Sequence, residues 1–140
     1  MSGKSGRTPH DTAVQWAFGV PERAAVELRA VLPAAVLRHL ELSTLRVASG
    51  TLAEPGEPNL HTDILYEVRF AGRDAYVYVL FEHQSWVERW RALRLLGYLV
   101  RILEHHRQLH PNSEVLPVVI PLVLHHSESG WRAPGRLVRL

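Results

Sequence analysis

Three polar residues follow directly on an apolar run in this sequence, and their types suit the binding of a metal ion. Residues 77–81 read VYVLF, and Glu82, His83 and Gln84 come next. An unbroken apolar run of this kind is typical of a strand buried on both faces. Because side chains two residues apart share a strand face, Glu82 and Gln84 would point the same way from the end of that strand.

Asp63 supplies a second carboxylate on the preceding predicted strand. Residues 61–70 alternate between apolar and polar side chains, and residues 75–84 follow after the segment AGRD, as in an antiparallel hairpin. With the turn centred near residues 72 and 73, Asp63 is expected directly opposite Glu82, with Cβ atoms about 4.5–5.5 Å apart. Two carboxylates at that distance repel each other unless a cation lies between them or one is protonated. A hard cation such as Mg²⁺ is often held by one or two carboxylates together with substrate phosphate.

A purely structural role for Glu82 is the alternative interpretation. Strands often end in polar residues where they leave the core, and Glu82 could instead form an ion pair with an arginine such as Arg94. Periodicity alone favours this structural interpretation over a metal site. His61 shares a strand face with Asp63, where it would contact a phosphate, orient a carboxylate or have no role.

The elements that would position these residues follow from the hydrophobic periodicity. Short helices are predicted at residues 10–18 and 22–32, with a further helical turn through Leu40, and the first strand begins near Leu45. In the strand at residues 61–70, side chains alternate between the two faces of the sheet. One face is expected to be formed by Ile64, Tyr66, Val68 and Phe70.

Residues 87–109 give the strongest helical pattern in the chain. Its apolar stripe is formed by Ala92, Leu95, Leu96, Leu99, Ile102 and Leu103. The opposite side is formed by Arg91, Arg94, Arg101 and His105. Two prolines in the last predicted strand, Pro117 and Pro121, place it at a sheet edge or at a bulge. The pattern predicts an α/β (α+β) fold with one mixed central sheet flanked by helices, in the order α-β-β-β-α-β.

The composition is that of one ordinary globular domain. The chain has 140 residues, of which 46% are apolar and 21% charged, and its lack of cysteine excludes disulfides and thiolate metal sites. The formal net charge of +2 permits nucleic acid binding without demanding it. Residues 1–9 are small and polar, so we expect a flexible leader before a single domain at residues 10–140 of a soluble, cytoplasmic protein. The final residues stop without a clear helix or strand ending, which suggests a domain truncated at its C-terminus.

Two pairs of adjacent histidines, His105–His106 and His125–His126, raise the question of a zinc site. Adjacent residues do not share a helix face, and no cysteine is present to complete a structural zinc site. We therefore give little weight to zinc binding at either pair.

Five segments, taken in order, resemble the Rpn/YhgA-like family of recombination-promoting nucleases and transposases, which belongs to the PD-(D/E)XK nuclease superfamily. They read HDTAVQWAF (10–18), HTDILYEV (61–68), YVYVLFEHQS (76–85), RALRLLGYLVRILE (91–104), and LPVVIPLVLHH followed by GW (116–131). The most specific part is EHQS after an apolar strand, followed by RLL and a tyrosine. The resemblance covers most of the chain and implies a restriction-endonuclease-like core.

The resemblance implies a Mg²⁺-dependent DNA endonuclease of bacterial recombination or transposition, with Mn²⁺ as an alternative metal. Asp63 matches the aspartate of the PD half and Glu82 matches the (D/E) position, so both would ligate the metal together with the backbone carbonyl of His83. Gln84 completes the catalytic set where the superfamily usually has lysine, and an amide neither titrates nor carries charge. The alternative is therefore a non-catalytic DNA-binding or assembly module that retains the nuclease fold.

Further expectations follow from the same resemblance. His10 and Asp11 match the HD that opens the family pattern and are accessory candidates beside His61, while Asp11 also suits a helix N-cap. Gln15 and Gly97 stand where the family commonly has basic residues. Two alternatives are open for the arginines at and before the long helix: contacts with DNA phosphate, or a solvated helix face. These residues are Arg89, Arg91, Arg94 and Arg101. Double-strand cutting would suggest a homodimer, because one such site cuts one strand.

Overall fold

The computed structural model describes residues 9–48, 61–82 and 89–125, apart from the side chains of residues 9–12, 14, 61 and 62. Within these ranges the elements are α1 (Pro9–Phe18), α2 (Pro21–Val31), α3 (Ala34–Leu37), β1 (Leu40–Val47), β2 (His61–Phe70), β3 (Arg73–Glu82), α4 (Arg91–Leu109) and β4 (Val118–His125). The order of helices and strands is the predicted one. Of the helices in these ranges, none has the length and apolar character needed to span a membrane.

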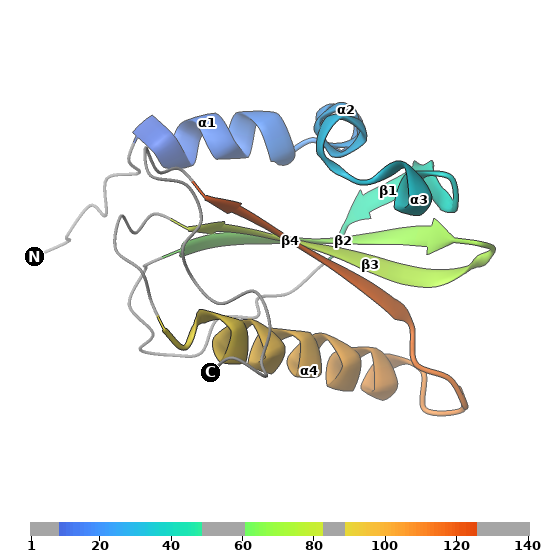
Figure 1. The fold of residues 1–140 in the computed structure, drawn as a ribbon. Coiled ribbons are helices and arrows are strands. Elements are labelled where there is room, and N and C mark those ends of the chain that lie inside the picture. The colour runs from blue at the N-terminus through green and yellow to red at the C-terminus, as the bar shows by residue number, and fades with distance from the viewer. Residues whose placement is uncertain (1–8, 49–60, 83–88, 126–140) are drawn as a thin grey trace, which may run out of the picture.

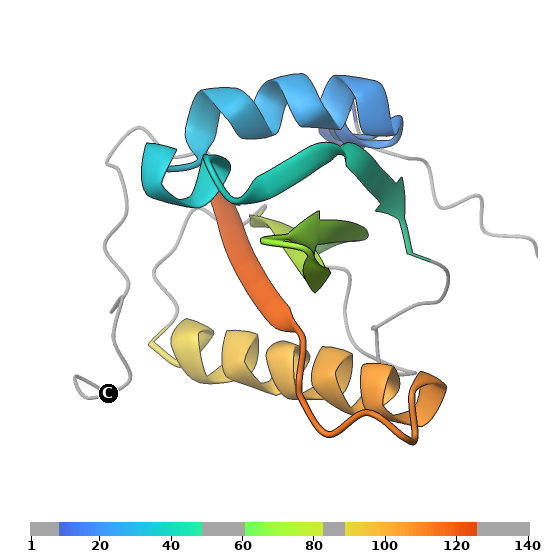
Figure 2. The same ribbon diagram turned by 90° about the vertical axis from the view of Figure 1, so that its right-hand side faces the viewer.

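The strands form one mixed sheet in the order β1-β2-β3-β4. β2 runs antiparallel to β1 and β3, whereas β3 and β4 are parallel and are connected through α4. The helices α1, α2 and α3 lie on one side of the sheet and α4 lies on the other, so both faces are covered (Figure 1 and Figure 2). This arrangement confirms the predicted mixed α+β fold and is consistent with a restriction-endonuclease-like fold.

The face of the sheet under α1 and α2 forms the larger core. The alternation predicted for β2 is confirmed, because Ile64, Tyr66 and Val68 are buried on this face. Phe18, at the end of α1, packs edge-on against Phe81 with ring centroids 5.0 Å apart. The hydroxyl of Tyr66 donates a hydrogen bond to the backbone carbonyl of Phe18, and burial raises the pKa of Tyr66 well above its usual value. Tyr66 therefore ties the end of α1 to the sheet.

The opposite face of the sheet packs against α4. Tyr76 and Tyr78 of β3 contact a cluster that includes Tyr98 and Ile102 of the helix. The hydroxyl of Tyr76 is hydrogen-bonded to Nδ1 of His106 at 2.8 Å, which fastens the last part of α4 to the sheet. Burial lowers the pKa of His106, and a neighbouring histidine lowers it further, so this imidazole is neutral near pH 7.

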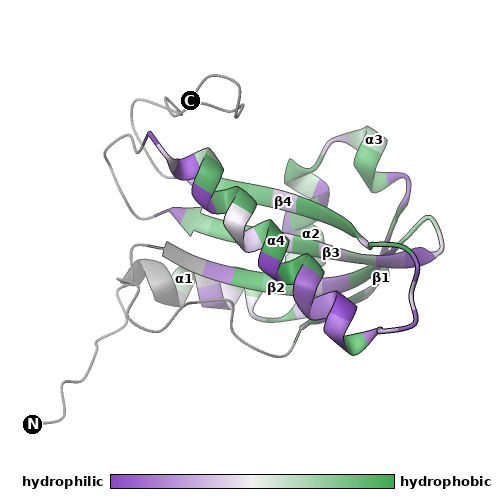
Figure 3. Cartoon of the chain, turned by 90° about the horizontal axis from the view of Figure 1, so that it is seen from below, coloured by the Kyte–Doolittle hydropathy of each residue, from purple (hydrophilic) through white to green (hydrophobic). Residues whose placement is uncertain are grey.

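The inward face of α4 differs in part from the predicted apolar stripe. Leu95 and Ile102 pack toward the sheet as predicted, whereas Leu96 is 39% exposed and Arg91 only 3%. The placement of Arg91 on the solvent side was wrong because a buried carboxylate, Glu82, lies beside it and gives it a partner. Hydrophilic residues gather in the last turns of the helix (Figure 3).

The first and last strands of the sheet lie at its two edges. β1 begins at Leu40 and not near Leu45, the predicted start. Its pairing with β2 is irregular between Glu41 and Arg46. The alternation of buried and exposed side chains is therefore interrupted within β1, and the sequence pattern indicates only its second half. β4 contains Pro121 and lies at an edge, as the prolines predicted.

A two-residue turn joins β2 to β3. Its residues, Ala71 and Gly72, both have positive φ, at 48° and 75°. Positive φ at both positions is typical of the type I′ turn, whose twist matches that of the flanking strands. Phe70 pairs directly with Arg73, so the connection is tighter than the predicted AGRD loop. This turn sets the register of the whole hairpin.

Candidate metal centre

One end of the sheet brings together three of the chain's polar side chains. Because β2 is antiparallel to β3 and β4 is parallel to it, the start of β2 lies beside the ends of β3 and β4. Asp63 lies near the start of β2, Glu82 ends β3, and His125 ends β4. The register places all three on the face that α4 covers, because directly paired residues point to the same side of a sheet.

Asp63 and Glu82 are diagonal neighbours on this face. Asp63 pairs with Leu80, and Glu82 pairs with His61, so the predicted direct pairing of the two carboxylates was wrong. The cause is the tight turn, which shifts the register by two residues from the expected one. A shift of two leaves every side chain on its expected face, and diagonal neighbours at roughly 7–8 Å remain within reach of long side chains.

Glu82 is a buried carboxylate held by two arginines from α4. It is 1% exposed, and its Oε1 accepts a hydrogen bond from Nη2 of Arg94 at 3.0 Å. Nε of Arg91 lies 3.5 Å from the same oxygen. A buried carboxylate loses several kcal/mol of hydration free energy, and the two guanidinium groups offset that cost. The ion pair with Arg94, predicted as the structural role of Glu82, is confirmed.

The second oxygen of Glu82 is different. Within the part of the chain that the structure describes, Oε2 is buried and has no hydrogen-bond partner. A buried acceptor left in this way is costly, because its hydration is not replaced. Oε2 therefore has capacity for a ligand.

Tyr78 orients the other carboxylate. Its hydroxyl donates a hydrogen bond of 2.8 Å to Oδ2 of Asp63. The Tyr78 ring lies 6.0 Å from the ring of Tyr98 on α4, so the donor is held between the sheet and the helix. A carboxylate has acceptor sites on both oxygens, and Asp63 therefore keeps capacity for a further ligand.

The donor set fits a hard divalent cation. Asp63 and Glu82 lie on one face, and each carboxylate can accept more ligands than its described hydrogen bonds supply. Oε2 of Glu82 is also shielded from solvent. Hard cations such as Mg²⁺ take oxygen ligands of this type. Arg91 and Arg94 carry as much positive charge as the two carboxylates carry negative charge, so a cation here would compete with them for Glu82.

The remaining arginines of the predicted set occupy other positions. Arg89 is exposed just before α4, with its guanidinium carbon 5.3 Å from the ring centroid of Trp90. Arg101 lies over Tyr98 at 5.3 Å. Of the four arginines predicted to contact phosphate, Arg91 and Arg94 thus face Glu82, and contacts of any of the four with DNA stay a prediction.

Several predicted site residues lie outside the described residues. His83 and Gln84 follow the last described residue of β3, and the side chains of His10, Asp11 and His61 are likewise not described. By its backbone, α1 begins at Pro9, so Asp11 lies in the first turn and not at the N-cap. The roles of all five residues stay predictions.

Three residues beside the Asp63 and Glu82 carboxylates were not predicted as part of the site: Tyr78, Tyr98 and His125. Tyr78 could have been predicted from the sequence. Side chains alternate between the faces of a strand, so Tyr78 shares the face of Glu82, four residues later. His125 was considered only as half of an adjacent pair. Its position beside Glu82 depends on the parallel pairing of β4 with β3, which the sequence pattern does not specify.

Comparison with known proteins identifies the relatives of this chain. A family model described as "Putative transposase, YhgA-like" matches residues 8–140. The chain is 31% identical over 134 residues to "Recombination-promoting nuclease RpnD" of Escherichia coli O157:H7, covering 96% of this chain and 50% of that protein. It is 31% identical over 122 residues to "Recombination-promoting nuclease RpnC" of Escherichia coli strain K12, covering 87% and 40%.

A further relative carries a different description. The chain is 29% identical over 129 residues to "Inactive recombination-promoting nuclease-like protein RpnE" of Escherichia coli strain K12, covering 92% of this chain and 42% of that protein. The chain thus spans half or less of the length of these curated relatives. No solved structure shows a significant match.

Proposed function

Because the chain belongs to the YhgA-like family, we propose that it is a Mg²⁺-dependent endonuclease domain that hydrolyses phosphodiester bonds of DNA. Mn²⁺ would serve in place of Mg²⁺, since both are hard cations that take oxygen ligands. Two of the relatives are described as recombination-promoting nucleases, which supports DNA as the substrate. A bacterial nuclease of this kind would act in the cytoplasm, during recombination or transposition.

The observation that carries this proposal is the buried Oε2 of Glu82, which has no hydrogen-bond partner among the described residues and lies on the sheet face that Glu82 shares with Asp63. Asp63 and Glu82 would hold the metal, together with the backbone carbonyl of His83. When bound, Mg²⁺ polarises the scissile phosphate and lowers the pKa of a coordinated water. Gln84 would orient the attacking water through its amide.

The chain's own residues prepare this site before any ligand binds. Tyr78 fixes the orientation of Asp63 through its hydroxyl, while Arg94 fixes Glu82 through Oε1 and leaves Oε2 directed elsewhere. Preorganised donors reduce the cost of arranging the site during the reaction. Arg89 and Arg101 are the candidates for phosphate contacts along α4. Cutting of both strands would proceed through a homodimer.

The second candidate function is a DNA-binding or assembly module without catalysis. Arg91 and Arg94 favour it, because they neutralise the negative charge of Glu82 that would otherwise attract a metal ion. The relative described as inactive supports the absence of catalysis in this candidate. Gln84 in place of the usual lysine points in the same direction, because the amide supplies no charge.

Nicking of supercoiled plasmid separates the two functions. The full chain is incubated with plasmid and Mg²⁺, and in parallel with EDTA. Lewis-acid stabilisation of several kcal/mol corresponds to a rate change of roughly a thousandfold. Asp63→Asn and Glu82→Gln should therefore lose nearly all Mg²⁺-dependent nicking. Glu104→Gln, an exposed carboxylate on α4, is the matched control and should nick at the wild-type rate.

The outcomes discriminate clearly. Nicking that persists in EDTA, or an Asp63→Asn variant as active as wild type, would overturn the endonuclease proposal. If nicking is absent, calorimetry with Mg²⁺ and fluorescence anisotropy with labelled duplex DNA identify the alternative. DNA binding without cutting supports the non-catalytic DNA-binding module, and the absence of both DNA binding and cutting refutes the endonuclease and the DNA-binding module.

A further inference from the structure

A second cluster of ligand-type side chains lies at the other end of the face that α4 covers. Asp74 stands at the start of β3, just after the hairpin turn, and His106 and His110 stand at the end of α4. Their ligand atoms all lie within 4.8 Å of one another. The two histidines are four residues apart, so they occupy the same helix face. His110 is the C-cap residue of α4, and its N–H donates to the carbonyl of His106, one turn earlier, at 2.9 Å.

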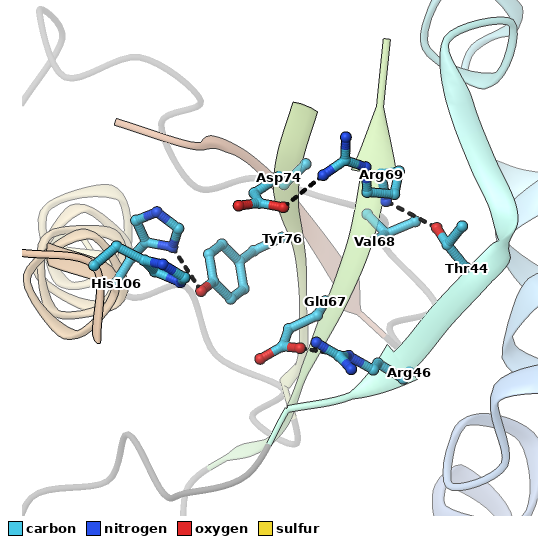
Figure 4. Close-up of a pocket in the computed structure, with 10 residues that line it drawn as sticks. Thr44, Arg46, Glu67, Val68, Arg69, Asp74, Tyr76 and His106 are labelled. Atoms are coloured by element: carbon cyan, nitrogen blue, oxygen red, sulfur yellow. Dashed lines mark hydrogen bonds and ion pairs between the residues drawn. The ribbon is translucent and has the colours of Figure 1, made fainter. Parts of the chain in front are cut away.

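Two of the three side chains are already oriented by neighbouring groups. Nδ1 of His106 is hydrogen-bonded to the hydroxyl of Tyr76 at 2.8 Å, which leaves Nε2 as its ligand atom. Oδ1 of Asp74 accepts a hydrogen bond from Nη1 of Arg69 at 2.8 Å. Figure 4 shows both interactions beside the cavity that the cluster lines. Metal-binding histidines and carboxylates are usually held by such outer hydrogen bonds.

We propose that Asp74, His106 and His110 bind Zn²⁺ or a similar borderline divalent ion. Two imidazole nitrogens and one carboxylate oxygen form a donor set typical of zinc sites with an open fourth position, and imidazole disfavours Mg²⁺. A tetrahedral ion with bonds of about 2.0–2.1 Å places its ligand atoms about 3.3 Å apart. Asp74 and His110 are exposed, so their side chains can turn inward to reach that spacing around the buried His106.

The ion would join two elements that are distant in sequence. Asp74 belongs to the β2–β3 hairpin, whereas His106 lies in the last turn of α4 and His110 is its C-cap residue, so binding would clamp the end of the helix onto the sheet. The fourth position would face a cavity of about 280 Å³, whose lining includes Arg46 and Arg69. Water or a small anion could occupy it there. This site is separate from the Asp63–Glu82 cluster and does not depend on the nuclease proposal.

Metal titration of the full chain without a histidine tag tests this inference. Calorimetry with Zn²⁺ should report binding, and the visible absorption of Co²⁺, its spectroscopic substitute, should show a tetrahedral spectrum. His110→Ala and Asp74→Asn change exposed residues, so circular dichroism should show both variants folded. Each should weaken Zn²⁺ binding by roughly tenfold or more, in line with the 10–100-fold effect that loss of even an outer-sphere partner has on metal affinity.

His105→Ala is the matched control, because His105 is exposed on the same helix turn and lies outside the cluster. It should bind Zn²⁺ like wild type. Two results would each overturn the inference: no Zn²⁺ binding by wild type, or equal weakening by His105→Ala and His110→Ala.

Discussion

Arg94 offers a direct test of how the buried carboxylate is held. Arg94→Met removes the 3.0 Å hydrogen bond to Oε1 of Glu82 and keeps most of the apolar side chain. A hydrogen bond to a charged group contributes about 1.5–3 kcal/mol, and breaking a buried ion pair costs about 3–5 kcal/mol. Arg91 remains 3.5 Å from the same oxygen, and the Arg94 side chain is 22% exposed. We therefore expect a loss of about 2 kcal/mol in the free energy of unfolding, near the lower of these ranges.

Thermal and urea unfolding measure this loss. For a domain of this size, about 2 kcal/mol lowers the melting temperature by roughly 6–10 °C. Arg107→Met removes an exposed arginine from the last turn of the same helix and should change stability by less than about 0.5 kcal/mol. An Arg94→Met variant that melts with the wild type would refute the reasoning, because Glu82 would then not depend on this ion pair.

The same substitution should have the opposite effect on the proposed Mg²⁺ site. Arg94 repels a dication bound at Oε2 of Glu82, and a repulsion of only about 1.4 kcal/mol changes affinity tenfold. Calorimetry should therefore show Mg²⁺ binding that is tighter in Arg94→Met by roughly tenfold, although the fold is less stable. Weaker Mg²⁺ binding in this variant would contradict a metal site that competes with the arginine.

Four further predictions concern Tyr66, Ala71 and Tyr78. Tyr66→Phe leaves the Phe18 carbonyl without its donor and should lower the free energy of unfolding by about 1–2 kcal/mol in urea titration. Burial raises the pKa of Tyr66 in the folded state, so above about pH 10 Tyr66 ionises in the unfolded chain before it does in the folded one. The wild type should therefore lose stability as the pH rises through this range. Tyr66→Phe should lose less there, and an equal loss would exclude Tyr66 as the cause. Ala71→Gly relieves a positive φ of 48° and should raise stability by up to about 1 kcal/mol; a lower melting temperature would argue against the type I′ turn. Tyr78→Phe removes the donor to Asp63 and should weaken Mg²⁺ binding roughly 10–100-fold, whereas unchanged affinity would exclude an orienting role.

The faces of the strands could be predicted from the sequence, but their register could not. Alternating side chains identified the inward face of β2, and residues such as Tyr66 are buried there. The register depends on the turn, and the expected glycine-containing loop was longer than the Ala71–Gly72 pair that forms it. Alanine is disfavoured at positive φ, so its presence gave no signal for a two-residue turn. Asp63 consequently pairs with Leu80, although it keeps its predicted face.

The inward face of α4 shows a second limit of periodicity. Hydropathy placed Arg91 in solvent, yet it is buried beside Glu82. A charged residue takes up an interior position only where a partner offsets its loss of hydration. That partner comes from the end of β3, and the contact arises only when the helix packs on the sheet. Arg94 was correctly predicted as a partner of Glu82.

The cluster at the end of α4 was missed for a different reason. The adjacent pairs His105–His106 and His125–His126 are the more conspicuous histidine pattern, but His106 and His110 have the four-residue spacing that places side chains on one helix face. That part of the signal was present in the sequence. The approach of Asp74 was not, because it requires the hairpin to end beside the last turn of the helix.

The most direct test of the proposed metal centre is a crystal structure of the chain soaked in Mn²⁺, with the ion located by its anomalous scattering. We predict a peak bound by a carboxylate oxygen of Asp63 and by Oε2 of Glu82, the buried oxygen that has no hydrogen-bond partner among the described residues. A map with no peak at that end of the sheet, and Glu82 still held only by Arg91 and Arg94, would contradict a metal-dependent nuclease centre.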